Sequence, residues 1–420
     1  MKICAVSQSF FPHTGGVSYY LLWLGRKCRE LNHELCVIHL KPAKAPPEEV
    51  VESIKVYRVP KTSLDSRILS GYTQFKELIL KIFHGGELSE DKLINKHLYG
   101  FNDYFTINKF FSGQVREVYE KEHFDLLHVH DFQLLPLGSL LNDLTVPKIF
   151  TWHIPYTDKP SPQWRKFVVQ YMTHYDRVVF STRPYVAVAI QDGLSWDKAV
   201  CISPFVTVER VKGDFRSNYG IKPDERVILC VARIDPLKGQ DRLIKALPII
   251  LKEIPNVRCV FVGDGSMTKE ILKAEGKRRY EEELKSLVAE LKLEAHVIFT
   301  GHISRRDLMT AYAAADVVVL PSIMEGFGLA VAEGMAFGKP VVGTATGGIM
   351  MQIWPGVNGF LVEPGNVKQL SEAILKILTD KKLSQKMGKK ALQIFNSLFS
   401  LERGVRDNIE LYEQVLGVEF

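Results

Sequence analysis

Two glutamates, Glu325 and Glu333, lie eight positions apart around a glycine-containing turn, in the stretch Pro321-Ser-Ile-Met-Glu-Gly-Phe-Gly-Leu-Ala-Val-Ala-Glu-Gly-Met-Ala-Phe-Gly338. The apolar run 315–320 before the turn is typical of a buried strand, and residues 329–336 are good helix formers. The sequence therefore predicts a strand, a turn and a helix N-terminus, where free N–H groups and the helix dipole hold anions. At roughly 100° per residue, Glu333 falls within about 80° of the face of Glu325, so both carboxylates can line one pocket.

This combination of groups indicates a particular kind of ligand. Carboxylates beside an anion site are unfavourable for a phosphate itself, but they suit hydroxyl groups attached to that phosphate. A nucleotide sugar carries both kinds of group. The alternative is that the two glutamates only cap and solvate a surface helix.

A pair of cations forms the second candidate group. Arg233 ends the apolar strand that begins at Arg226, and Lys238 precedes Gly239 in the loop before the next helix. Two fixed cations at a strand end, close to a helix N-terminus, can neutralise a diphosphate. Solvated loop charges are the alternative.

Polar residues also end two strands in the first half of the chain. The segment 124–131 finishes with His130 and Asp131, and the segment 147–153 finishes with Trp152 and His153. The carboxyl ends of parallel strands are where open α/β sheets bind ligands. Another glycine loop, with Gly15 and Gly16, follows the first strand and precedes a helix expected from residue 18 to about 31.

The elements that must position these groups alternate between strands and helices. This alternation predicts an α/β protein with parallel, doubly wound sheets, and 420 residues suit two domains. We expect an N-terminal acceptor domain at 1–206, a donor domain at 207–395 and a last helix at 396–420 that crosses back to the first domain. Residues 63–122 mix aromatics and lysines, and are either helices that pack on the sheet or a flap that contacts the acceptor or a membrane.

Bulk properties narrow the class further. The net charge of +6 does not demand nucleic acid, and the chain shows no 18-residue apolar run. We expect no signal peptide, because the first residues resemble a short strand and no cleavage site follows them. The six cysteines show no C-x-x-C spacing, which predicts buried free thiols in a cytoplasmic protein. We leave open a peripheral contact with a membrane.

The stretch around Glu325 and Glu333 resembles the Glu-x₇-Glu signature of the retaining glycosyltransferases of family 4. Their GT-B fold has two Rossmann-like domains that face a central cleft, and the resemblance covers nearly the whole chain. It implies catalytic roles for Arg233, Lys238, His153 and Glu325. It implies donor-binding roles for Gly15, Gly16, Gly263, His302, Ile303, Gly326, Phe327, Gly328, Leu329 and Glu333, and acceptor-binding roles for His130, Asp131, Gln133 and Trp152.

Two departures from the family pattern are informative. Family members often have Pro-Asn-Gly-Val where this chain has Pro-Phe-Val at 204–206, and Gly-Gly-Ile-Pro-Glu where it has Met350 and Met351. The second segment, which ends in Gln352 and Ile353, resembles the branch that makes trehalose from a nucleotide-glucose and glucose.

The resemblance implies transfer of a hexosyl group, glucosyl in that branch, from a nucleoside diphosphate sugar to an acceptor hydroxyl. We expect no cofactor and no essential metal, because side chains supply the cations and no Asp-x-Asp motif lies at a strand end. Three alternatives stay open: a family member that acts on a membrane lipid or a glycan, a GT-B disaccharide phosphorylase, and a non-catalytic sugar-binding subunit.

Overall fold

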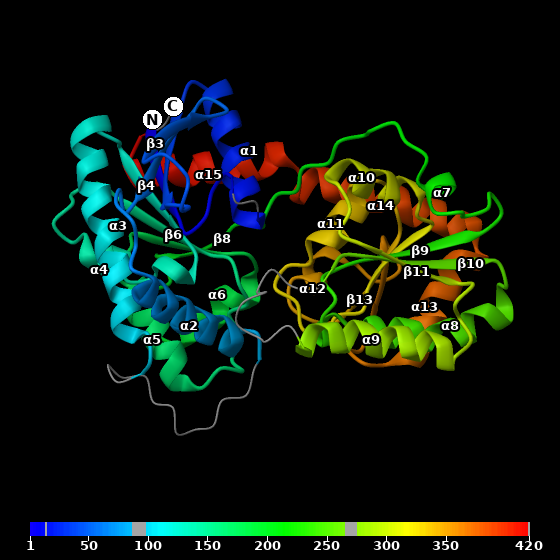
Figure 1. The fold of residues 1–420 in the computed structure, drawn as a ribbon. Helices are drawn as coiled ribbons and strands as arrows, with labels where there is room; N and C mark the ends of the chain where they lie inside the picture. Colours follow the sequence, from blue (N-terminus) through cyan, green and yellow to red (C-terminus); the bar gives the residue numbers. More distant parts are fainter. Residues whose placement is uncertain (13–14, 86–97, 265–274, 419–420) are drawn as a thin grey trace. The chain divides into compact units, whose positions relative to one another are not determined.

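The computed structural model describes residues 1–12, 15–85, 98–264 and 275–418 (Figure 1). The chain forms two compact units. The first comprises Met1–Phe205 together with Leu401–Phe420, and the second comprises Val206–Ser400. Each unit is built around its own sheet, and each is described separately below.

The N-terminal unit contains an eight-stranded sheet with the order β3-β4-β2-β1-β5-β6-β7-β8. Its strands are β1 (Lys2–Ser7), β2 (Glu34–Leu40), β3 (Glu48–Val51), β4 (Ile54–Val59), β5 (Leu126–His130), β6 (Lys148–Trp152), β7 (Arg177–Phe180) and β8 (Ala199–Cys201). All neighbouring pairs are parallel, as the alternation of elements predicts, except that β3 runs antiparallel to β4 at the edge. The β3–β4 turn holds Glu52 and Ser53 at positive φ without the Asn-Gly pair that normally signals such a turn.

Helices cover both faces of this sheet. They are α1 (Gly16–Glu30), α2 (Ser66–Phe83), α3 (Phe101–Glu122), α4 (Leu137–Leu140), α5 (Pro162–Met172) and α6 (Arg183–Gln191), with a 3₁₀ turn η1 (Phe132–Leu134). The last helix, α15 (Leu401–Leu416), lies beside α1 (Figure 1). The two helices share one apolar cluster that includes Leu24, Cys28, Ile409 and Tyr412.

The described parts of residues 63–122 form α2 and α3. Their aromatic side chains Tyr72, Phe75, Phe83, Tyr104 and Phe111 are all fully buried in the core. Packing on the sheet is therefore the correct interpretation for these two helices. Residues 86–97 of the predicted flap lie outside the described residues.

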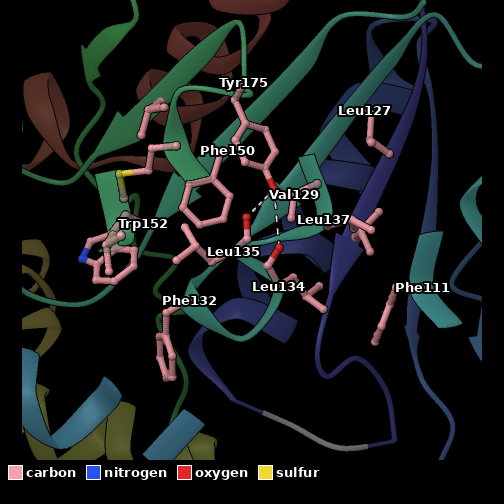
Figure 2. Close-up of a cluster of buried hydrophobic side chains, with 14 of the residues drawn as sticks. Phe111, Leu127, Val129, Phe132, Leu134, Leu135, Leu137, Phe150, Trp152 and Tyr175 are labelled. Carbon is pink, nitrogen blue, oxygen red and sulfur yellow. Dashed lines mark hydrogen bonds between the residues drawn. The ribbon is translucent and has the colours of Figure 1, made fainter. Parts of the chain in front are cut away.

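Figure 2 shows part of this core around β5 and β6, where Phe150, Trp152 and Tyr175 gather with leucines that follow β5. The Tyr175 hydroxyl lies 3.2 Å from the carbonyl oxygen of Leu135 and 3.4 Å from that of Leu134. These bonds tie the segment after β5 to the sheet. The segment that follows the polar residues at the end of β5 is therefore anchored to the core.

The C-terminal unit contains a six-stranded, fully parallel sheet with the order β11-β10-β9-β12-β13-β14. The strands are β9 (Arg226–Val231), β10 (Val257–Val262), β11 (Val297–Gly301), β12 (Val317–Leu320), β13 (Val341–Thr344) and β14 (Gly359–Val362). Its helices are α7 (Phe215–Asn218), α8 (Gln240–Glu253), α9 (Glu275–Glu290), α10 (Arg305–Ala314), α11 (Leu329–Ala336), α12 (Ile349–Gln352), α13 (Val367–Thr379) and α14 (Lys381–Leu398), with a 3₁₀ turn η2 (Pro236–Lys238).

The helix that carries Glu333 is fixed closely to this sheet. Every residue of α11 after Leu329 is buried, and a Cβ atom on Gly334 would lie 2.8 Å from Cγ2 of Val318 in β12. Only glycine therefore lets α11 lie so near the strand. The position of Glu333, one residue earlier, is set by this contact.

Two further expectations concern the whole chain. All six cysteines are free, five of them buried and Cys201 half-buried, as the absence of C-x-x-C spacing predicts. No helix within the described residues is long and apolar enough to span a membrane.

Candidate functional site

The order of the C-terminal sheet reverses between β9 and β12, and ligands of open α/β sheets bind at such a point. Lys238 lies in the loop after β9, and Glu325 lies in the turn after β12. Their side chains form an ion pair with 2.8 Å between Lys238 Nζ and Glu325 Oε2, and each is 14% exposed. The fold therefore joins the two groups that the sequence proposed separately for a diphosphate and for sugar hydroxyls.

Glu325 is held by its own turn as well. Its Oε1 accepts a hydrogen bond from the Gly326 N–H at 3.1 Å, and its Oε2 accepts one from Ser322 Oγ at 3.2 Å. The Ile323 N–H donates to the Leu237 carbonyl at 2.8 Å, which ties this turn to the loop of Lys238. The carboxylate is thus oriented before any ligand arrives.

A second glycine turn, after β13, packs backbone to backbone against the first. The Gly348 N–H donates to the Gly326 carbonyl at 2.8 Å. Gly347 has φ +49°, and a Cβ atom there would lie 1.8 Å from the carbonyl oxygen of Glu325. Glycine is therefore required for the two turns to meet.

Gln352 joins both turns from inside the protein. Its buried amide donates to the Phe327 carbonyl, and also approaches the carbonyls of Gly328 and Gly348 at 3.4 Å each. Met350, which replaces the second-last residue of the usual Gly-Gly-Ile-Pro-Glu pattern, is 53% exposed. The sequence predicted no structural role for Gln352, which served only to show the resemblance to the trehalose-forming branch. Its part in shaping the site comes from the structure.

Glu333 is engaged on both oxygens. Its Oε1 pairs with Arg305 Nη1, and its Oε2 accepts a hydrogen bond from the Tyr312 hydroxyl at 2.6 Å. Arg305 also donates to the carbonyl oxygen of Thr207. The sequence analysis missed Arg305 and Tyr312, although their spacing of seven residues on α10 places them on one helix face and is the signal that could have found them.

The other expected donor-binding residues differ in how exposed they are. Arg233 and His302 are exposed, Ile303 is half-buried, Phe327 is buried, and Leu329 is 44% exposed at the start of α11. The Arg233 carbonyl accepts a hydrogen bond from Gln240 Nε2 at 2.7 Å. A Cβ atom on Gly263, where φ is +131°, would lie 2.2 Å from the Ala232 carbonyl, so this glycine is needed for backbone packing beside the Arg233 loop.

The N-terminal sheet also has a point where its order reverses, between β1 and β5. Asp131 follows β5 in a backbone conformation (φ +74°, ψ +165°) that is rarely adopted except by glycine. Burial raises the pKa of its carboxyl group to about 7. Hydrogen bonds from the backbone N–H groups of Phe132 and His153 and from the Gln133 side chain lower this pKa, but burial has the larger effect. The charge of Lys76 on α2 also lowers it, and Lys76 Nζ donates to Gln8 Oε1 at 3.2 Å.

His130 and His153 lie together, with 3.1 Å between His130 Nδ1 and His153 Nε2 and an angle of 18° between the rings. Burial lowers the pKa of His153 to about 4 and that of His130 well below its usual value. A third histidine, His128, lies against His130 with ring centroids 4.0 Å apart. Sequence reasoning passed over His128, as well as Tyr20, whose ring meets both His130 and His153.

Three predicted residues of the N-terminal unit have positions that bear on their roles. Trp152 is fully buried in the core (Figure 2). Its indole N–H donates to the Pro155 carbonyl at 3.3 Å. Its ring packs in the core and does not reach the surface, and its acceptor-binding role stays a prediction. Gly15 caps α1 in an extended conformation, and among the described residues no atom would lie within 4 Å of a Cβ at Gly15 or Gly16. Packing therefore does not explain these two glycines.

The cluster of histidines does not form a metal site. In the described parts of the chain, no group of three or more His, Cys, Asp or Glu side chains is arranged to hold a metal ion. The arrangement in the C-terminal unit instead offers fixed cations, carboxylates and a helix N-terminus, which together suit a phosphorylated ligand that carries hydroxyl groups.

Comparisons with known proteins give the same two-part division. Residues 14–210 match the family described as "Glycosyltransferase Family 4", and residues 211–393 match "Glycosyl transferases group 1". A trehalose synthase of Thermococcus litoralis is 31% identical over 317 residues, which are 73% of each chain.

Solved structures show the same fold. A sucrose-phosphate synthase from Thermosynechococcus elongatus superimposes with a TM-score of 0.74 at 22% identity, over 99% of each chain. HepE of Anabaena, in complex with UDP-glucose, superimposes with a TM-score of 0.71 at 21% identity, over 99% of this chain and 100% of that one.

Proposed function

The chain belongs to the family 4 glycosyltransferases of the GT-B fold, in the trehalose-related branch, and from this premise we propose that it transfers a glucosyl group from a nucleoside diphosphate glucose to glucose, forming trehalose. One observation carries the proposal. Lys238 and Glu325 are paired at the point where the C-terminal sheet reverses its strand order, beside the N-terminus of α11. This arrangement offers a cation for the diphosphate and a carboxylate for the sugar within a few ångströms of each other.

The donor would be held by the C-terminal unit. Arg233 and Lys238 would stabilise the negative charge that grows on the departing diphosphate, and the dipole of α11 would add to this. Glu325 would accept hydrogen bonds from sugar hydroxyls. Glu333 would accept them from the ribose, with Arg305 and Tyr312 keeping its carboxylate in place.

We propose that the reaction retains the configuration of the anomeric carbon and needs no metal. The acceptor hydroxyl would attack from the face that the diphosphate leaves, and its proton would pass to an oxygen of that diphosphate. The bond from the anomeric carbon to the diphosphate breaks as the bond to the acceptor oxygen forms. His153 and Asp131, which follow the neighbouring strands β6 and β5, would bind substrate hydroxyls.

The choice of glucosyl group and acceptor rests on the relatives. The trehalose synthase of Thermococcus litoralis is the basis for the product, and the UDP-glucose complex of HepE is the basis for the donor class. Neither relative defines the nucleobase for this chain. A panel of nucleoside diphosphate glucoses is therefore part of the test.

The test begins with the purified protein, a panel of nucleotide sugars and glucose, and follows nucleotide release and product formation. Proton NMR of the product reports the anomeric configuration, and a chelator in one arm tests whether a metal is needed. Sugar phosphate formed from a disaccharide and inorganic phosphate would instead indicate a phosphorylase. No turnover with any donor, in a protein that binds nucleotide, would favour a sugar-binding subunit.

Arg233→Ala then tests the diphosphate role. Removal of one charge that stabilises the transition state should lower kcat by about 10²–10³-fold while circular dichroism stays unchanged. Arg210→Ala removes an exposed arginine of the same unit and should leave kcat within about twofold. An Arg233→Ala variant as active as Arg210→Ala would exclude the proposed role of Arg233.

A further inference from the structure

The contact between His130 and His153 needs one ring to donate and the other to accept. The two nitrogens, Nδ1 of His130 and Nε2 of His153, are 3.1 Å apart. Burial lowers the pKa of both rings, so both are neutral at physiological pH and each carries one N–H. Two arrangements of the protons are therefore possible, and they give His153 opposite properties at its other nitrogen.

The surroundings of His130 distinguish the two arrangements. Its side chain is fully buried, and Nε2 has no hydrogen-bond partner among the described residues. If His153 donated, the His130 proton would be on Nε2 as a buried N–H group without an acceptor. If His130 donates from Nδ1, only a bare ring nitrogen is left at Nε2. Buried N–H groups without acceptors are rarer in folded proteins than incompletely satisfied acceptors, so the second arrangement is favoured.

The His130 ring is fixed from its other side. His128 lies against it, and both nitrogens of His128 are bonded, Nδ1 to the Tyr412 hydroxyl at 2.8 Å and Nε2 to Thr151 Oγ1 at 2.7 Å. His128 thus cannot turn to supply a partner for His130 Nε2 without losing its own bonds. The backbone of His153 is held in turn, because its main-chain N–H donates to Asp131 Oδ1 at 3.2 Å.

We propose that His130 is a positioning residue that fixes His153 as the tautomer with its proton on Nδ1, so that His153 offers a hydrogen-bond donor to an oxygen atom of the sugar. The sugar as ligand rests on the function proposed above. The tautomer itself does not, because it follows from the contacts within the N-terminal unit.

This assignment restricts what His153 can do. With its Nε2 lone pair occupied by His130, and with a proton on Nδ1, neutral His153 has no nitrogen free to accept a proton. It acts as a donor to a hydroxyl or ring oxygen and not as a general base. His153 is half-buried, whereas His130 is fully buried, so the ring that can meet a ligand is the one whose tautomer is fixed.

The tautomer can be measured directly in the whole protein labelled with ¹⁵N-histidine. Long-range ¹H–¹⁵N correlation spectra distinguish a protonated ring nitrogen from a bare one, and the His153→Gln variant assigns the resonances. In the wild-type protein we expect a protonated Nδ1 and a bare Nε2 on both His153 and His130. A protonated Nε2 on His153 would overturn the proposal, whatever the activity of the protein.

Three variants of His130 extend the test. The amide nitrogen of His130→Asn can take the place of Nδ1 and should keep the tautomer of His153, with a smaller loss of kcat/KM than in His130→Asp. His130→Asp places an acceptor there and should move the His153 proton to Nε2, with a loss of about 10–100-fold in kcat/KM, the effect of one lost hydrogen bond. His130→Leu offers neither group and should show both tautomers, with an intermediate loss.

The outcomes separate this proposal from the proposed function. Identical His153 spectra in the Asn and Asp variants would overturn the positioning role of His130. The expected spectra in a protein that transfers no sugar would keep the tautomer assignment and refute the function. The wild-type spectrum decides the tautomer even if a variant fails to fold.

Discussion

Replacement of Lys238 by Met removes the cation of the Lys238–Glu325 pair and leaves a side chain of similar length. The two charged atoms are 2.8 Å apart and each side chain is 14% exposed, so the pair lies between a surface pair and a fully buried one. A surface pair contributes about 0–1 kcal/mol, and loss of one partner of a fully buried pair costs about 3–5 kcal/mol. Because Glu325 keeps its bonds from Ser322 and Gly326, we expect Lys238→Met to cost about 2 kcal/mol.

A double-mutant cycle with Glu325→Gln separates stability from catalysis. The neutral amide should tolerate the loss of Lys238, so urea unfolding of the two single variants and the double variant should give a coupling energy of about 1–2 kcal/mol. The activity of Lys238→Met should fall by about 10²–10³-fold in kcat, because the charge on the departing diphosphate loses a cation. The second substitution cannot restore this charge. The double variant should therefore regain stability but not activity.

Three results would refute this reasoning. A coupling energy below about 0.3 kcal/mol would show that the ion pair does not hold the two loops together. A Lys238→Met variant with kcat within about tenfold of wild type would show that Lys238 does not face the diphosphate. Recovery of activity in the double variant would likewise mean that its loss came from the unpaired carboxylate.

Two further predictions test the turns of the C-terminal unit and the histidines of the N-terminal unit. Gly347→Ala and Gly356→Ala both place a Cβ at a residue with positive φ, which should cost each variant about 1–2 kcal/mol of stability. Only at Gly347 would the new Cβ clash with the Glu325 carbonyl oxygen, 1.8 Å away. Calorimetry should therefore show nucleotide affinity reduced at least about tenfold in Gly347→Ala only; equal affinities would contradict the packing of the two turns. Burial lowers the pKa of His128 to about 3. Below pH 6.5 the native state therefore binds fewer protons than the unfolded state, and the free energy of unfolding decreases as the pH falls below 6.5. Between neutral pH and about pH 4.5, two pH units below the usual pKa of histidine, urea unfolding should show that the wild-type protein loses about 3 kcal/mol more unfolding free energy than His128→Gln. Equal losses in the two proteins would exclude a neutral buried His128.

The sequence determined the kinds of chemistry through local patterns. The buried run before Glu325, the glycines after it and the helix formers that follow predict a strand, a turn and a helix, and the structure has β12, the turn and α11 there. These features depend on neighbours within about two helical turns, so a single sequence contains enough information. The antiparallel strand β3 escaped prediction because its turn, with Glu52 and Ser53 at positive φ, lacks the residues that normally signal it.

Only the tertiary structure decided which of these groups meet. Lys238 and Glu325 are 87 positions apart and pair because β9 and β12 are neighbours in the sheet, and no local pattern shows that order. For the same reason, the contacts of Glu333 with Arg305 and of His130 with His153 appear only in the folded chain. Trp152 and His153 are adjacent in sequence, yet Trp152, the last residue of β6, is fully buried, whereas His153, in the loop that follows, is half-buried. Sequence set the chemistry that each segment can offer, and the order of the strands set which segments offer it together.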